Sequence, residues 1–138
     1  MENSTLTPGL LQGEPPKTTL FRKEISGITY RIPALIYIDD SQTFLAFAEK
    51  RTSPCDHDAT LLVMRRGARQ NGSIQWSPVQ ELSTACLPGY RSMNPCPVYE
   101  KESKTLFLFF SCVLGKTTEH YQIFTVTIVG PHGALEKE

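Results

Sequence analysis

The feature of this chain that most constrains its fold is an internal repeat at a spacing of 62 residues. A displacement of 62 positions, without gaps, aligns Pro33 with Pro95, Tyr37 with Tyr99, Ser41 with Ser103, Thr43 with Thr105 and Phe47 with Phe109. Each copy reads as a proline-led strand, a polar turn of about four residues and a second apolar strand. A hairpin unit that recurs after a few tens of residues is typical of radial repetition, as in a β-propeller. A chain of 138 residues holds roughly two such units, and closure needs at least about four, so we expect an incomplete ring.

Apolar and β-branched runs elsewhere in the chain also predict an all-β fold. The first hairpin is expected at residues 34–38 and 43–48. A third strand is expected at 61–64, closed by Arg65-Arg66-Gly67, and a fourth at 73–79, which contains the only tryptophan. No run of about twelve residues has a clean helical period, so no long helix is expected.

Composition excludes several classes of function. Fourteen basic residues balance fourteen acidic ones, and without a basic stripe there is no electrostatic reason to expect nucleic acid as a partner. The polar start has no signal-peptide pattern, and the longest apolar run, residues 106–110, is too short to span a membrane. We therefore expect a cytoplasmic or peripheral membrane protein. Four widely spaced cysteines without a Cys-x-x-Cys pair favour free thiols in a reducing compartment over a metal site.

Two arginines and an aspartate are expected at one end of the first repeat. Arg31 lies in Tyr30-Arg31-Ile32-Pro33, just before the first hairpin strand, Arg51 follows the hairpin, and Asp56 lies five residues further on. Taken singly, each has a structural interpretation, because arginines at strand ends are usually solvated or paired and an aspartate after Ser-Pro is often a turn residue. Taken together, two guanidinium groups and a carboxylate suit an anionic ligand.

Four motifs in this order resemble the vertebrate sialidases of the cytosolic and membrane-associated type. They are Tyr30-Arg31-Ile32-Pro33, Phe47-Ala48-Glu49-Lys50-Arg51 with its later aspartate, Arg91-Ser92-Met93-Asn94-Pro95-Cys96-Pro97, and Thr118-Glu119. The resemblance runs from about Phe21 to about Gln122. It implies a six-bladed β-propeller, of which this chain would hold roughly the first two blades. It also implies hydrolysis of terminal α-linked sialic acid from gangliosides, oligosaccharides and glycoproteins, without a cofactor or metal.

The resemblance assigns roles to individual residues. Arg31 and Arg51 match two arginines on the carboxylate side of the substrate, and Asp56 matches the general acid/base. Glu119 matches a carboxylate that contacts the sugar, and Asn94 is a candidate for the pocket wall. The carboxylate of sialic acid repels an anionic nucleophile, and sialidases accordingly use a tyrosine. The remaining polar residues are interpreted as loop residues (His57, Asp58) or as solvated or structural arginines (Arg65, Arg66, Arg91).

Parts of the family pattern are missing from the chain. No tyrosine, including Tyr90, Tyr99 and Tyr121, has the sequence context of the family's nucleophile. The family's Ser-x-Asp-x-Gly-x-x-Trp turn is matched only in part, by residues 71–76 with altered spacing. From Phe124 the sequence no longer resembles the family. We therefore expect a flexible tail at 1–18, an incomplete sialidase domain at 19–123 and a divergent tail at 124–138.

Three interpretations of function stay open at this point. In the first, the chain is the amino-terminal part of an exo-α-sialidase that is inactive alone, because triad-like groups act as a unit. In the second, it is a catalytically dead short isoform that acts as a binding module. Such a module would bind sialosides weakly or pair with other chains through the open sheet edge near residues 124–129. Peripheral attachment to plasma or endolysosomal membranes stays open for any of these interpretations. In the third, it is a fragment without a settled fold.

Overall fold

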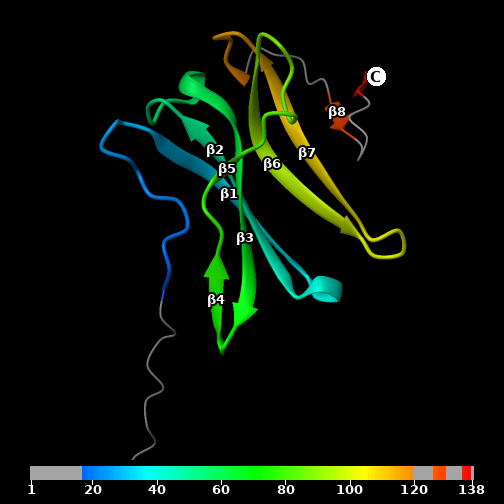
Figure 1. Ribbon diagram of the computed structural model, residues 1–138. Helices are drawn as coiled ribbons and strands as arrows, with labels where there is room; N and C mark the ends of the chain where they lie inside the picture. Colours follow the sequence, from blue (N-terminus) through cyan, green and yellow to red (C-terminus); the bar gives the residue numbers. More distant parts are fainter. Residues whose placement is uncertain (1–16, 120–125, 130–134, 138) are drawn as a thin grey trace, which may run out of the picture.

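The computed structural model describes residues 17–119, 126–129 and 135–137 (Figure 1). These residues form two antiparallel sheets with short 3₁₀ turns between strands, among them η1 (Asp39–Ser41) and η2 (Asp56–Asp58). The prediction of an all-β fold is confirmed. Among the described residues no helix is long and apolar enough to cross a membrane.

The chain builds the two sheets one after the other. The first sheet has the order β1-β2-β3-β4, with β5 also paired to β3, and the second has the order β6-β7-β8-β9. The strands of the first sheet are β1 (Thr29–Ile38), β2 (Thr43–Arg51), β3 (Ala59–Gln70), β4 (Ser73–Trp76) and β5 (Gln80–Glu81). Those of the second are β6 (Tyr90–Glu100), β7 (Thr105–Leu114), β8 (Val126–Val129) and β9 (Leu135–Lys137).

The 62-residue repeat is confirmed by strand register. Ile36 pairs with Leu45 in the β1–β2 hairpin, and the equivalent residues Val98 and Phe107 pair in the β6–β7 hairpin. Both hairpins have a register shift at the same place, between Arg31 and Ala34 in β1 and at the corresponding point in β6. The two copies therefore share their irregularities as well as their strands.

The backbone conformation supports the same conclusion. The residue before the shared proline has a positive φ in both copies, 51° at Ile32 and 54° at Asn94. The last residue of each hairpin turn is also left-handed, with φ of 48° at Gln42 and 52° at Lys104. Proline lacks an N–H for the strand ladder, and a bulge is one of the few sites in a strand that tolerates it.

Several predicted strand limits differ from the structure, and β2 for example continues to Arg51. The motif Tyr30-Arg31-Ile32-Pro33 lies inside β1 rather than before it, because the bulge accommodates the proline. β3 continues to Gln70, beyond the predicted end at residues 65–67, because these residues pair with β2 and with β4. The strand expected at 73–79 stops at Trp76, ahead of Ser77-Pro78.

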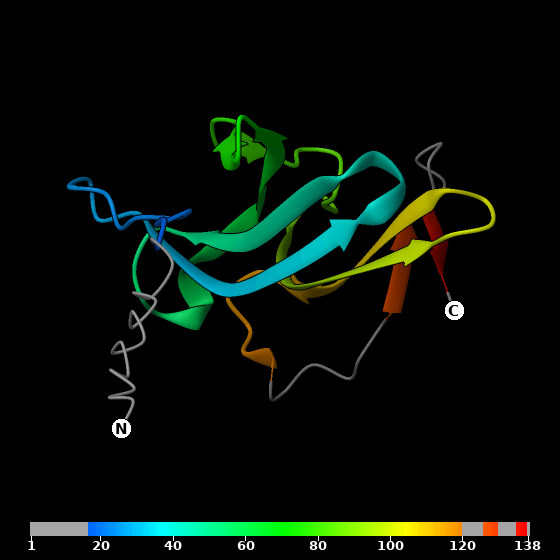
Figure 2. The same cartoon turned by 90° about the horizontal axis from the view of Figure 1, so that it is seen from below.

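The two sheets pack face to face, and the core lies between them (Figure 2). One buried cluster joins Ile38, Leu45 and Phe47 of the first sheet to side chains of the second, namely Tyr99, Leu106 and Leu108. A neighbouring cluster joins Leu62 to Ala85, Phe110 and Cys112. The packing therefore brings together strands that are far apart in the sequence.

The predicted end segments are only partly covered. Residues 1–16 of the expected tail lie outside the described residues, as do 120–125, 130–134 and 138. Within the described residues β8 pairs with β7 on one side and with β9 on the other, so it is not the outermost strand of its sheet.

Candidate functional site

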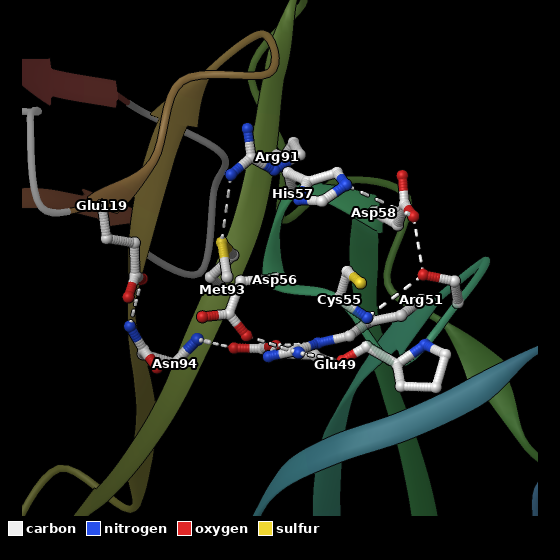
Figure 3. Close-up of polar contacts among 12 residues, drawn as sticks. Glu49, Arg51, Cys55, Asp56, His57, Asp58, Arg91, Met93, Asn94 and Glu119 are labelled. Atoms are coloured by element: carbon white, nitrogen blue, oxygen red, sulfur yellow. Dashed lines mark hydrogen bonds and ion pairs between the residues drawn. The ribbon is translucent and has the colours of Figure 1, made fainter.

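A buried carboxylate on β2 forms the centre of the candidate site. Glu49 and Arg51 are two residues apart and so share one face of the strand, and their side chains are 0% and 1% exposed. Glu49 Oε2 accepts hydrogen bonds from Arg51 Nε at 2.8 Å and from Nη2 at 2.6 Å. Glu49 Oε1 accepts one from the backbone N–H of Asn94 in β6 at 2.8 Å (Figure 3). Glu49 therefore joins the two sheets through its two oxygens.

The other side of the Arg51 guanidinium holds Asp56. Arg51 Nη1 donates to Asp56 Oδ1 at 2.6 Å and to the carbonyl of Pro54 at 3.1 Å. Burial disfavours the charged form of Arg51, but the hydrogen bonds and charges of Glu49 and Asp56 outweigh it and raise the pKa of Arg51. The side chain of Asp56 is 71% exposed. A buried and permanently charged arginine thus presents a carboxylate to solvent.

The loop that carries Asp56 is fixed at its next acidic residue. Asp58 accepts hydrogen bonds from Ser53 Oγ at 2.6 Å and from Lys116 Nζ at 3.1 Å, and Lys116 also donates to the carbonyl of His57 at 3.3 Å. These bonds from Ser53 and Lys116 lower the pKa of Asp58. Asp58 and His57 act as loop residues, as expected, and Lys116 ties the loop to the segment that follows β7.

Asn94 and Glu119 form the second part of the site. Asn94 lies at the β6 bulge, and its Nδ2 donates to Glu119 Oε1 and to Ser111 Oγ, the latter at 3.5 Å. Because its backbone N–H binds Glu49, Asn94 connects Glu119 to the Arg51–Asp56 pair. The structure therefore brings four of the five predicted site residues into one hydrogen-bonded network (Figure 3).

Arg31, the fifth predicted residue, has no described contact with this network apart from backbone pairing with Glu49. Among the described residues its exposed side chain has no hydrogen-bond or ion-pair partner. It borders a cavity of about 430 Å³ that is otherwise lined mainly by apolar residues, Phe21 and Leu35 among them. Within the part of the chain that the structure describes, the Arg31 guanidinium thus has no partner, whereas every guanidinium nitrogen of Arg51 has one.

Two other arginines are structural, as expected. Arg65 donates to the carbonyls of Ser77 and Leu20, at 2.7 and 2.6 Å. Arg91 is buried and donates to the carbonyls of Gly115 and Thr117, next to Lys116.

Sequence reasoning missed Glu49, which holds the site together. The available signal was a glutamate within the mostly apolar run of β2, two residues before an arginine. A carboxylate at an inward-facing position requires a charged partner, since an isolated buried charge is strongly unfavourable.

One cluster in the described residues has the donors for a metal ion. The ligand atoms of Cys55, His57 and Asp58 all lie within 4.8 Å of one another. Asp58 is already bound by Ser53 and Lys116. All four cysteines are free thiols in the structure, and only Cys112 is buried.

Comparison with known proteins identifies the family. The chain is 57% identical to Sialidase-3 of Mus musculus over 107 residues, which cover 77% of this chain and 26% of the relative. It is 58% identical to Sialidase-3 of Homo sapiens over 105 residues, or 75% of this chain and 24% of the relative. The chain belongs to the sialidase family. Mus musculus Sialidase-2 is 50% identical over 111 residues, 79% of this chain and 29% of that protein.

The sialidase resemblance predicted from four sequence motifs is thereby confirmed. The chain spans about a quarter of the length of the curated relatives it matches. No protein-family model matches it.

Proposed function

We propose that this chain is the amino-terminal part of an exo-α-sialidase, and that its two sheets are the first two blades of a six-bladed β-propeller. The observation that carries the proposal is the identity of 57% to a sialidase over 77% of the chain. The network that joins Asp56, Arg51, Asn94 and Glu119 supports it, because these residues come from both sheets and from the segments that follow β2 and β7.

Each residue then has a role in cleaving a terminal α-linked sialic acid. Asp56 acts as the general acid/base, since its carboxylate is held by one oxygen and is mostly exposed. Arg31 binds the substrate carboxylate, because a free guanidinium offers the planar pair of donors that a carboxylate accepts. Arg51 stands behind Asp56 and positions it. Glu119 and Asn94 form a wall that contacts the sugar.

The chain on its own is proposed to be inactive. Catalysis in this family uses a tyrosine nucleophile, and no tyrosine of the described residues hydrogen-bonds to the network of Asp56, Asn94 and Glu119. Tyr30 instead donates to Glu24, and burial and this hydrogen bond raise its pKa to about 12. Burial and a hydrogen bond to Asp40 raise the pKa of Tyr99 as well. Tyr121 lies outside the described residues.

A binding experiment tests the carboxylate site. Saturation-transfer NMR with an α-methyl sialoside should show a complex whose affinity falls about tenfold or more in Arg31→Ala, since a charge-assisted bidentate pair is lost. Arg66→Ala is the matched control, because Arg66 is also an exposed arginine of the first sheet. Equal binding by wild type and Arg31→Ala would contradict the role of Arg31.

A hydrolysis experiment tests the inactivity of the chain. Purified chain should release no product from a fluorogenic sialic acid glycoside between about pH 4 and 7, a range that spans the ordinary carboxyl pKa values. Release that Asp56→Ala abolishes would show that the chain contains a working nucleophile. That result would refute the proposed inactivity and support the role of Asp56.

The second candidate function is a binding or interaction module without catalysis. Exposed apolar side chains such as Leu35 and Val98, on the outer faces of the two sheets, favour it. Gangliosides, oligosaccharides and glycoproteins are the proposed sialylated ligands in either case. Cytoplasmic or peripheral membrane location is a further proposal, and fractionation of cells that express the tagged chain tests it.

A further inference from the structure

The two sheets expose apolar residues on the sides that face away from the core. We call the residues on the outer side of the β1–β2 hairpin the first face (Leu35, Tyr37, Phe44, Ala46) and those of the β6–β7 hairpin the second face (Cys96, Val98, Phe107, Phe109). Ala46 is buried, whereas Leu35, Tyr37, Cys96 and Val98 are exposed. Leu35 is 62% exposed and Val98 is 46% exposed. Patches of this kind on a small protein are typical of interaction sites.

The internal repeat relates these faces to the core. The core residues of the first sheet include Ala34, Ile36, Leu45 and Phe47. Their equivalents 62 positions later are the residues of the second face, Cys96, Val98, Phe107 and Phe109. The core residues of the second sheet include Tyr99, Leu106 and Leu108. Their equivalents 62 positions earlier are Tyr37, Phe44 and Ala46 of the first face. The described residues therefore contain one complete sheet-on-sheet interface, and the two outer faces repeat its two halves.

We propose that the second face of one copy of this chain binds the first face of another copy. The contact repeats, between chains, the packing that joins the two sheets within the chain. It is a head-to-tail contact, which forms a closed ring when the rotation between units closes. Since propellers have about four to eight blades, rings of about two to four copies are expected.

A polar contact gives the proposed interface a specific marker. Within the chain, Tyr99 Oη donates to Asp40 Oδ2 at 3.0 Å, across the two hairpins. The equivalent residues are Tyr37 of the first face and Glu102 of the turn between β6 and β7, so the hydroxyl and the carboxylate are both retained. We therefore expect Tyr37 of one copy to donate to Glu102 of the next.

The first face also has space for a partner's side chain. The cavity of about 430 Å³ is lined by Leu35, Ala46 and Ala48 together with Leu20 and Phe21. We expect an aromatic ring of the second face, Phe107 or Phe109, to enter this cavity, because burial of apolar area drives association.

Sedimentation velocity and light scattering on the full chain test the proposal. The expected mass is a concentration-dependent multiple of 15.5 kDa. Leu35→Glu and Val98→Glu should each weaken association about tenfold or more, because each places a charge at the centre of a desolvated face. Gln70→Glu, at an exposed position near the β3–β4 turn, is the matched control and should leave association unchanged. Near-ultraviolet circular dichroism establishes that each variant is folded.

Mixing the two face variants distinguishes this contact from other modes of assembly. Leu35→Glu keeps an intact second face and Val98→Glu keeps an intact first face, so an equimolar mixture should form a dimer that grows no further. Tyr37→Phe should weaken association several-fold by removing the contact to Glu102.

Three results would overturn the proposal. They are a monomer at all accessible concentrations, association that survives both face variants, and a mixture that forms no dimer. Survival of association in both variants would indicate edge-to-edge strand pairing instead. The expected ring size rests on the proposed propeller fold. Because none of these measurements involves a sialoside, a failure of association can be distinguished from a failure of sialoside binding.

Discussion

Replacing Glu49 by alanine is expected to lower the free energy of unfolding by about 3–5 kcal/mol, the usual cost of removing one partner of a buried ion pair. Glu49 is completely buried and accepts two hydrogen bonds from Arg51 and one from the backbone of Asn94. The unpaired N–H of Asn94 would by itself cost about 1–3 kcal/mol. The two costs overlap, since both follow from one lost carboxylate, so their sum is not expected.

This loss is large compared with a typical total stability of about 5–15 kcal/mol. Arg51 keeps its bonds to Asp56 and Pro54 in the variant, which limits the loss to the Glu49 side. Urea denaturation followed by far-ultraviolet circular dichroism and by the fluorescence of Trp76, the only tryptophan, measures it.

Two further variants separate charge pairing from packing. Glu81→Ala removes the partner of Lys50 in an ion pair whose glutamate is 51% exposed, and should cost less than about 1 kcal/mol. The double variant Glu49→Leu/Arg51→Met removes both buried charges and should recover much of the loss, because no unpaired charge remains. The reasoning is refuted if Glu49→Ala costs no more than Glu81→Ala, or if the double variant is less stable than Glu49→Ala.

Three other predictions follow from local geometry. The pKa of Tyr30 is raised to about 12 by burial and by Glu24. The contribution of protonated Tyr30 to the free energy of unfolding should therefore be complete below about pH 10, the ordinary tyrosine pKa. It should be lost as pH rises through the pKa of Tyr30 in the folded protein. Absorbance titration should show this late ionisation, and Glu24→Gln should move it toward the ordinary value; an unchanged titration would contradict the assignment. Gly67→Ala would place Cβ about 3.0 Å from the ring of Trp76. It should cost about 1–3 kcal/mol, and a urea midpoint equal to that of wild type would contradict this. Ile32 has a φ of 51°. Ile32→Asn should raise the melting temperature, since asparagine adopts the left-handed conformation with about 1 kcal/mol less steric strain than a β-branched residue. A lower melting temperature would show that this strain is absent.

The sequence alone determined the fold class, the repeat and the family of this protein. These properties follow from information that is local along the chain, such as strand-like apolar runs, a turn at a fixed offset and short motifs in a fixed order. The sequence also named Asp56, Asn94 and Glu119 as site residues through their motifs. It placed the ends of β1, β3 and β4 less well, because pairing partners and a bulge set those limits.

Only the tertiary structure decided how the site is held together. Arg51 and Asn94 lie 43 residues apart (94 minus 51), yet both bind the same carboxylate because the second sheet packs onto the first. Propensity and periodicity carry no information on which buried charges meet, since pairing depends on the register and packing of distant strands. The same packing distinguished Arg51, whose guanidinium is fully bonded within the protein, from Arg31, whose guanidinium remains exposed.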